Sequence, residues 1–292
     1  MLDNYLLEEL TTFARTGTLA KTAAQLNVTQ PTVTRGMQKL EADWGVRLFD
    51  RQPNRITLTP TGKLAAQEAA ALLQAQHQAI KKVQNFERSQ RHLTIGSTLP
   101  GPLMLLQHLR PQLPVQTMIT ANLLTDQNLT QKLQDRDYTL ILTSQAPTAP
   151  DITTQFLGTE NLAVNLNQFM YQANQADIRF AELKNLSFLV IADIGPWRDI
   201  IQRGIPGAKF LYQDQREAFR EISAYTDFPY FSSNFSFLDP LVTANTSKTN
   251  TVRLPIRDQS AHMAVYAAYL PTNQTAVAPI IRLLRENWPA TA

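Results

Sequence analysis

Polar side chains that can read the edge of a nucleic-acid base cluster between positions 29 and 38. Gln30 and Arg35 can form paired hydrogen bonds with adenine and guanine edges in a major groove. Threonine hydroxyls close to them suit phosphate oxygens or thymine methyl groups. The candidate DNA-binding set on this segment is Thr29, Gln30, Pro31, Thr32, Thr34, Arg35 and Gln38.

Two arginines, Arg51 and Arg55, flank a polar tip at residues 52–54 and suit a phosphate backbone or a minor groove. Structural roles compete with these assignments. Thr29 can serve only as a helix cap, and Arg51 can form a salt bridge with Asp50 or Glu41.

Few other residues have the type and spacing that catalysis or metal binding needs. The chain has no cysteine, and its four histidines are far apart. Zinc, iron–sulfur and thiolate chemistry are therefore excluded or improbable. No Ser-His-Asp arrangement or carboxylate pair stands out, and ten glycines give little support to a phosphate-binding loop. We therefore expect a binding protein without cofactor or metal, and not an enzyme.

Composition and charge predict that a polyanion partner binds the N-terminal part of the chain. The chain has 292 residues, with 43% apolar and 17% charged side chains, which suits two or more folded domains. Residues 1–92 carry 12 basic and 8 acidic side chains, net +4, which leaves 15 − 16 = −1 for the remainder. The start has no basic segment before an apolar run, and no stretch approaches a membrane span. The expectation is a soluble cytoplasmic protein.

The elements that must position the polar cluster are three short helices and a hairpin. Apolar spacing predicts helices over residues 2–15, 19–26 and 30 to about 43. The third has Pro31 in its first turn and buries Val33, Met37 and Leu40. Alternation over residues 48–59 predicts a small hairpin. Together these elements predict a winged helix-turn-helix, whose third helix fits a major groove.

A long helix follows from Thr61 to about Arg88. Its apolar positions alternate at spacings of four and three: Ala65, Ala69, Leu72, Gln76, Ala79, Val83 and Phe86. This heptad seam favours pairing with the same helix of a second chain. The alternative is that the helix packs on a neighbouring domain of its own chain.

From Arg91 onward predicted strands alternate with predicted helices, which is typical of parallel sheets joined by crossover helices. Strands are expected at 93–97, 116–121, 138–143, 187–192, 209–212, 229–232, 251–256 and 262–269, with one or two longer strands and a turn near Gly158 in 152–166. Helices are expected at 103–109, 129–134, 180–186, 197–203, 215–223 and 276–287. Two such sets predict two α/β lobes with a cleft between them.

The N-terminal sequence resembles the DNA-binding domain of the LysR-type transcriptional regulators. The motifs that carry the resemblance follow in unbroken order: Gly17-Thr18-Leu19, Ala23-Ala24-Gln25-Leu26, Val28 to Arg35, Leu40-Glu41, Gly45 to Arg51 and Leu58 to Gly62. Thr18 and Thr34 replace the usual serines, Trp44 replaces a common leucine, and Gly36 lies inside a helix, where it costs about 1 kcal/mol relative to alanine.

The resemblance extends in element order over the whole chain. It implies an α/β protein with a winged helix-turn-helix at 1–62, a dimerising linker helix at 63–90 and a periplasmic-binding-protein-like effector domain at 91–292. Lobe I is expected at about 91–164 and 255–292, and lobe II at about 165–254. The family further implies double-stranded promoter DNA as a partner, a small effector between the lobes, and a homotetramer built from two dimers.

Candidate effector-binding residues lie where predicted strands end, because helix N-termini present free N–H groups there. They are Ser97, Thr98, Leu99, Ser144, Gln145 and Trp197, the last as a wall. Asp193, near Trp197, argues against an anionic ligand on that loop. Each of these residues can equally be an ordinary cap or loop residue.

Two other protein classes compete with a regulator. A two-lobed solute-binding protein would need export, which the N-terminal sequence does not indicate. An α/β enzyme would need a reactive constellation, and none is recognisable.

Overall fold

The computed structural model describes residues 3–52, 55–239 and 250–290. The chain forms two compact units, Met1–Gln84 and Asn85–Ala292, and each is described by itself. The expected wing tip at 53–54 and the lobe II segment 240–249 fall outside the described residues.

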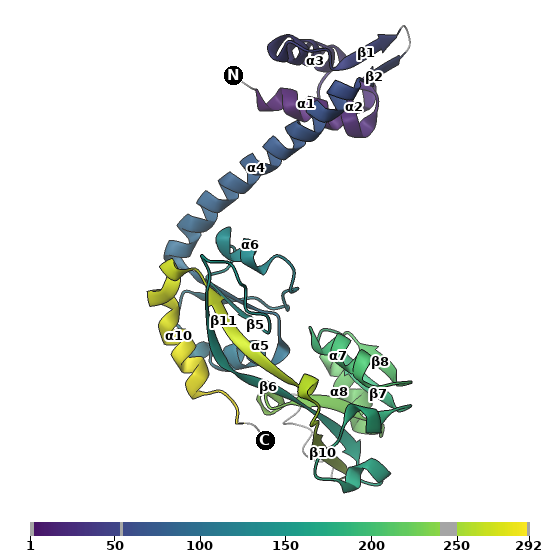
Figure 1. Ribbon diagram of the computed structural model, residues 1–292, viewed down its shortest axis with the longest axis vertical. Coiled ribbons are helices and arrows are strands. Elements are labelled where there is room, and N and C mark those ends of the chain that lie inside the picture. Colours follow the sequence, from purple (N-terminus) through teal and green to yellow (C-terminus); the bar gives the residue numbers. More distant parts are fainter. Residues whose placement is uncertain (1–2, 53–54, 240–249, 291–292) are drawn as a thin grey trace. The chain divides into compact units, whose positions relative to one another are not determined.

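The first unit begins with three helices whose ends follow from single residues (Figure 1). Gly17 ends α1 in a left-handed conformation at φ 74°, and Thr18 caps α2 by accepting the Lys21 N–H. Thr29 caps α3 in the same way. The elements are α1 (Asn4–Thr16), α2 (Leu19–Leu26), α3 (Gln30–Trp44), β1 (Phe49–Gln52), β2 (Arg55–Leu58) and the start of α4 (Pro60–Arg91).

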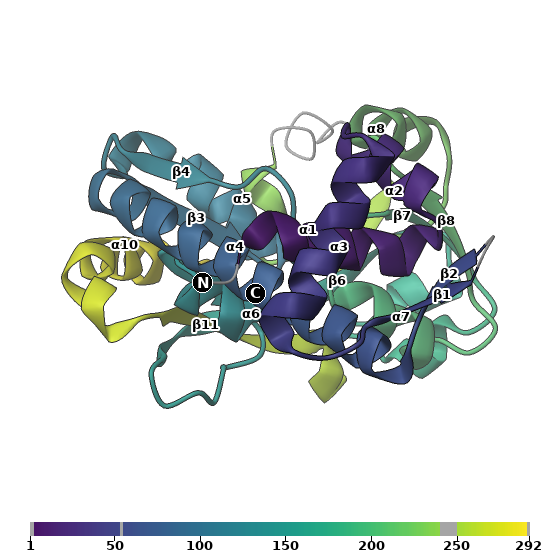
Figure 2. The ribbon, with the colours of Figure 1, turned by 90° about the horizontal axis from the view of Figure 1, so that it is seen from above.

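One hydrophobic core holds this unit together. Leu6, Leu10 and Phe13 of α1 pack with Val33, Met37 and Leu40 of α3, all at most 2% exposed. The expected buried face of α3 is therefore confirmed. Ala65, Ala66 and Ala69 of α4 join the same core, so the first positions of the predicted seam pack within their own chain. The antiparallel hairpin β1–β2 pairs Phe49 with Leu58 and extends away from the helices (Figure 2).

The second unit is built on a mixed sheet with strand order β4-β3-β5-β11-β6-β9-β7-β8, and β10 also pairs with β6. Parallel pairs join β3 with β4 and β5, and β7 with β8 and β9, while β6, β10 and β11 run antiparallel to their neighbours. The strands are β3 (Leu93–Ser97), β4 (Thr117–Ile119), β5 (Leu140–Thr143), β6 (Thr153–Asn167), β7 (Ser187–Ile191), β8 (Lys209–Gln213), β9 (Tyr230–Ser233), β10 (Thr251–Pro255) and β11 (His262–Tyr269).

Helices cover the two halves of this sheet and define two lobes, which lie on opposite sides of β6 in Figure 2. The first lobe packs α5 and α10 on β3, β5 and β11, and its core includes Ile95, Leu142 and Tyr269. The second packs α7 and η3 on β6, β7 and β10 around Phe188 and Trp197. The helices are α5 (Pro100–His108), α6 (Leu129–Gln134), α7 (Trp197–Gly204), α8 (Arg216–Tyr225) and α10 (Gln274–Glu286), with short 3-10 turns that include η3 (Phe180–Leu183) and η4 (Ser236–Leu238).

Three local expectations differ from the structure. Residues 153–167 form one strand that passes through both lobes, without the expected turn at Gly158. The pairing of β6 with β11 instead shifts register there, and Gly158 leaves room for the Trp288 indole. Residues 180–183 form a 3-10 turn where an α-helix was expected, and the purely parallel sheets are wrong because β6, β10 and β11 are antiparallel.

Among the helices of the described segments, none is long and apolar enough to cross a membrane.

Candidate nucleic-acid interface and ligand cavity

The outward face of α3 carries the side chains that were predicted to contact DNA. Gln30, Pro31, Thr32, Arg35 and Gln38 are exposed, whereas Val33 and Met37 on the other face are buried. Within the described part of the chain, the guanidinium of Arg35 has no ion pair or hydrogen bond. It is therefore free to meet a base edge or a phosphate.

Three threonine hydroxyls at the start of α3 are engaged by the protein itself. The Thr29 Oγ1 accepts the Thr32 N–H at 3.4 Å and lies 2.8 Å from the Thr32 hydroxyl. The Thr34 hydroxyl donates to the Gln30 carbonyl at 3.0 Å, and its side chain is half-buried. Thr29 thus caps the helix, which is the alternative to a DNA contact. The Thr34 hydroxyl would have to break or share its bond to the Gln30 carbonyl before it could contact DNA.

At the wing, the two arginines differ in their surroundings. Arg51 forms an ion pair with Glu41 at 2.8 Å, and Glu41 also accepts the Leu48 and Phe49 N–H groups. These interactions hold the pKa of Glu41 below its usual range against the opposing effect of burial. Arg55 is exposed, and no described residue pairs with its guanidinium. Arg51 therefore fixes the base of the wing, while Arg55 is the free cation.

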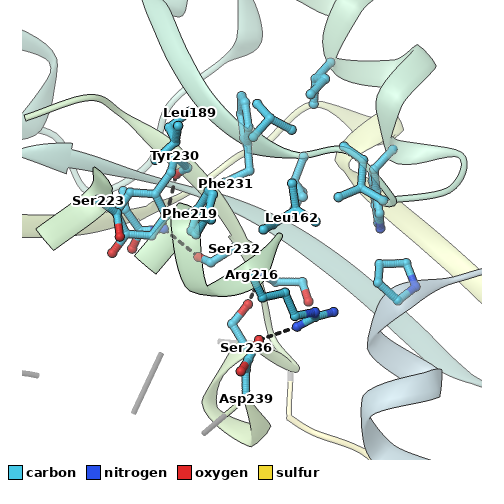
Figure 3. Close-up of a pocket in the computed structure, with 18 of the residues that line it drawn as sticks. Leu162, Leu189, Arg216, Phe219, Ser223, Tyr230, Phe231, Ser232, Ser236 and Asp239 are labelled. Carbon is cyan, nitrogen blue, oxygen red and sulfur yellow. Dashed lines mark hydrogen bonds and ion pairs between the residues drawn. The ribbon is translucent and has the colours of Figure 1, made fainter. Parts of the chain in front are cut away.

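A cavity of about 320 Å³ lies between the two lobes of the second unit (Figure 3). Its lining combines apolar and aromatic side chains with polar and charged ones, and Phe219 meets the ring of Tyr230 edge-on at 5.9 Å. Pro100 and Met104 of α5 and Glu160 of β6 also line it. The other apolar lining residues come from lobe II: Leu162, Leu189, Val190, Ile191, Ile194, Trp197, Ile201, Phe219, Tyr230 and Phe231.

Of the predicted effector-binding residues, Trp197 lines this cavity, and it is 2% exposed. Ser97, Thr98 and Leu99 are fully buried, and the Ser97 hydroxyl is used by the Leu99 backbone at 2.8 Å and 3.0 Å. Ser144 is half-buried and Gln145 is exposed. These five residues are not among those that line the cavity.

The backbone at Thr98, where a strand was predicted to end, lies against the loop before α7. Gly195, with φ 55°, lies so close to the Thr98 carbonyl that a β-carbon there would come within 2.4 Å of it. A side chain at position 195 would therefore push the two lobes apart at this point.

Glu160 on β6 is the buried charge of the cavity, at 1% exposure. Burial raises the pKa of Glu160 to about 7, although the Ser233 hydroxyl, the Trp197 indole and the Gly101 N–H act in the opposite direction. The indole N–H lies near the carboxyl without completing a hydrogen bond, and the Glu160 Oε2 also has no partner among the described residues.

Three arginines, Arg216, Arg220 and Arg253, also line the cavity. Arg216 forms an ion pair with Asp239 at 2.5 Å, seen in Figure 3. Arg253 donates from Nε to the Ser232 hydroxyl at 3.3 Å, and burial lowers its pKa. Arg253 pairs in register with Asn165, five residues along β6 from Glu160. At about 3.3 Å per residue, their backbones are on the order of 16 Å apart.

Sequence reasoning missed most of this cavity. Glu160, Phe219, Tyr230 and Arg253 come from four separated elements, and no spacing in the sequence links them. Only the antiparallel return of β10 and the passage of β6 through both lobes bring them together. A lone glutamate inside an apolar strand, Glu160 in 152–166, was the one available signal.

The first unit is thus a winged helix-turn-helix, and the second is a two-lobed α/β domain with a cavity. Residues 6–63 match the family of bacterial regulatory helix-turn-helix proteins of the lysR type. The regulator HdfR of Salmonella newport is 30% identical over 173 residues, which cover 56% of this chain and 60% of the relative. The chain thus matches less than two thirds of the length of these curated relatives.

Solved structures show the same fold over nearly the whole chain. Full-length OxyR C199D from Pseudomonas aeruginosa is 20% identical with a TM-score of 0.53, over 98% of this chain and 95% of that one. Vibrio fischeri DarR in complex with DNA is 16% identical with a TM-score of 0.55, over 97% and 99%. These structures thus show the fold of the whole chain, while the match to the lysR family covers residues 6–63.

Proposed function

We propose that the chain is a sequence-specific DNA-binding transcriptional regulator whose binding or activation changes with a small effector in the inter-lobe cavity. The observation that carries the proposal is the outward face of α3, where Gln30, Arg35 and Gln38 are exposed on a helix anchored by Val33 and Met37. This is the arrangement a recognition helix needs in a major groove. The likeness to full-length regulators, one of them in complex with DNA, supports it.

The rest of the proposal follows the layout of the family. Residues 1–62 bind promoter DNA, 63–90 pair two subunits, and 91–292 form the effector domain. Lobe I would comprise about 91–164 and 255–292, and lobe II about 165–254. Two heads on two half-sites supply the surface that tight specific binding requires. The exposed side chains of Leu72, Ile80 and Val83 on α4 support a homodimer, and a homotetramer of two dimers in the cytoplasm completes the proposal.

The proposed function is tested by fluorescence anisotropy with the DNA upstream of the protein's own gene and with a scrambled duplex. Arg35→Ala should weaken binding mainly to the upstream DNA, because a paired base contact is worth about 1–3 kcal/mol of discrimination. Arg55→Ala should weaken binding to both duplexes equally and make the salt dependence shallower. Equal affinity of the wild-type chain for both duplexes at every salt concentration would contradict the proposal.

A further inference from the structure

We propose that the inter-lobe cavity takes an apolar amine, whose basic nitrogen is received by the carboxyl of Glu160. The inference rests on the proposed regulatory function, and it specifies the chemical class of the effector. It starts from the most buried charge of the cavity. Glu160 is 1% exposed and lines the cavity, and its Oε2 atom has no hydrogen-bond partner among the described residues.

An acceptor oxygen withdrawn from water without a donor costs roughly 1–3 kcal/mol. A ligand in the cavity that brings a donor to the carboxyl, with the Glu160 side chain turned to present Oε2, recovers this cost, and a charged donor gives the stronger bond. The Ser233 hydroxyl, the Trp197 indole and the Gly101 N–H all act on this carboxyl, but none of them forms a hydrogen bond with Oε2.

Besides Glu160, charged side chains of both signs line the cavity. Asp193, in the loop before α7, lines the same cavity as Glu160 and Trp197. The cationic lining residues, Arg216, Arg220 and Arg253, come from α8 and β10. Two of them already have partners, since Arg216 pairs with Asp239 and Arg253 donates to Ser232. Arg220 is exposed, so water can solvate it, whereas the Glu160 Oε2 is buried without a donor. The unsatisfied group of the cavity is therefore the acceptor at Glu160.

The residues that line the cavity determine the size and polarity of the rest of the ligand. Leu162, Phe231 and the edge-to-face pair of Phe219 and Tyr230 surround a volume of about 320 Å³ (Figure 3). That volume lies at the lower end of typical small-molecule sites. A ring or branched hydrocarbon with one amino group fits this combination of aromatic wall and single buried carboxyl.

The test is isothermal titration calorimetry of the full chain with ligands that share a body and differ in the polar group. The probes are 2-phenylethylamine, 2-phenylethanol and phenylacetate, with the cyclohexyl and indolyl members of each series. We expect an amine to bind at least tenfold more tightly than its alcohol, and the carboxylate to bind least. Glu160→Gln, which keeps the shape, should remove the preference for the amine while the alcohol still binds. Glu286→Gln, an exposed glutamate on α10, is the matched control and should bind as the wild type does.

Several results overturn the inference. No amine binding at millimolar concentration, equal binding of the three classes, or loss of both amine and alcohol in Glu160→Gln would each contradict it. A preference for the carboxylate that Arg253→Gln abolishes would assign the cavity to an anion instead. DNA binding is measured on the same preparations. A chain that binds specific DNA but no amine overturns this inference alone, and one that binds an amine but no DNA overturns only the proposed regulatory function.

Discussion

At the residue scale, the DNA-binding unit contains a buried acid that the sequence did not reveal. Glu9 of α1 is 4% exposed and its Oε2 has no partner among the described residues. The carboxyl occupies the space beside Gly36 of α3, where a β-carbon would lie 1.7 Å from Oε2. The glycine inside the recognition helix is thus explained by close packing of α1 on α3.

Glu9 should make the stability of this unit depend on pH. Burial raises the pKa of Glu9 to about 7, whereas the same group in the unfolded chain titrates near 4.5. Between these values the folded state holds a proton that the unfolded state has lost, so stability falls as pH rises from about 4.5 to about 7. Because glutamine does not titrate, Glu9→Gln should remove a loss on the order of 1–2 kcal/mol in the free energy of unfolding over this pH range.

Urea unfolding of both chains at pH 5 and pH 8 measures this difference. The change with pH common to both chains comes from other groups, including Glu160, so only the difference between them belongs to Glu9. A pH dependence identical in wild type and Glu9→Gln would show that the Glu9 carboxyl is solvated.

Gly36→Ala should displace the Glu9 carboxyl from the helix interface. The obstacle to the new methyl group is the end of a flexible side chain, and alanine favours a helix over glycine by about 1 kcal/mol. We expect the free energy of unfolding at pH 8 to rise by up to about that amount, and the contribution of Glu9 to the pH dependence to disappear. Destabilisation with the pH dependence retained would mean that the Glu9 side chain cannot leave its site.

At the element scale, the sequence was most informative where a local signal decides the structure. Caps and turn residues such as Gly17, Thr18 and Thr29 set the limits of α1 to α3, and α2 has the predicted bounds of 19–26. The limits of these helices are set by residues only a few positions away in the sequence, so they do not depend on a distant partner.

Prediction failed where the fold is set by distant partners. Considered alone, Gly158 predicts a turn. In the structure its missing side chain leaves space for Trp288, which lies 130 residues later in the sequence. The antiparallel directions of β10 and β11 depend on which strand each one joins in the sheet, and helix–strand alternation does not encode this. The cavity residues Glu160, Phe219 and Arg253 were missed for the same reason.

The long helix α4 packs on its own chain at its start, and apolar side chains are exposed further along it. Ala65 and Ala69 are buried in the core of their own chain, whereas Leu72 and Phe86 are each 49% exposed and Val83 is 71% exposed. The exposed apolar stripe thus starts at Leu72. At the other end of the helix, the buried Asn85 donates to the Asp135 carbonyl at 2.7 Å and ties α4 to lobe I.

Leu72→Glu should separate paired subunits without unfolding the chain. The side chain is half exposed within one chain, so a charge there costs little by itself, while two charges facing each other in a dry seam repel. Light scattering should show a smaller particle, with the urea midpoint nearly unchanged. Ala70→Glu places the same charge at an exposed position on another face of α4 and should leave the assembly intact. A wild-type monomer at micromolar concentration with a normal DNA footprint would contradict the paired helix.

At the scale of the whole molecule, one continuous helix, Pro60–Arg91, runs from the proposed DNA-binding unit into the proposed effector-binding unit. Two-fold pairing along that helix would present two copies of α3 to DNA. A two-fold dimer requires a two-fold operator, with half-sites spaced by a helical turn or a multiple of it.

The most direct test of this account is selection of bound sequences from a random pool of duplex DNA by the full chain, followed by anisotropy with the recovered sequence. The account predicts enrichment of an inverted repeat, bound at least about 10³-fold more tightly than random DNA. The Arg35→Ala chain should lose most of that ratio while it keeps binding to random DNA. A pool that shows no enriched sequence, or an enriched sequence that the wild-type and Arg35→Ala chains bind equally, would contradict the central claim that α3 reads DNA.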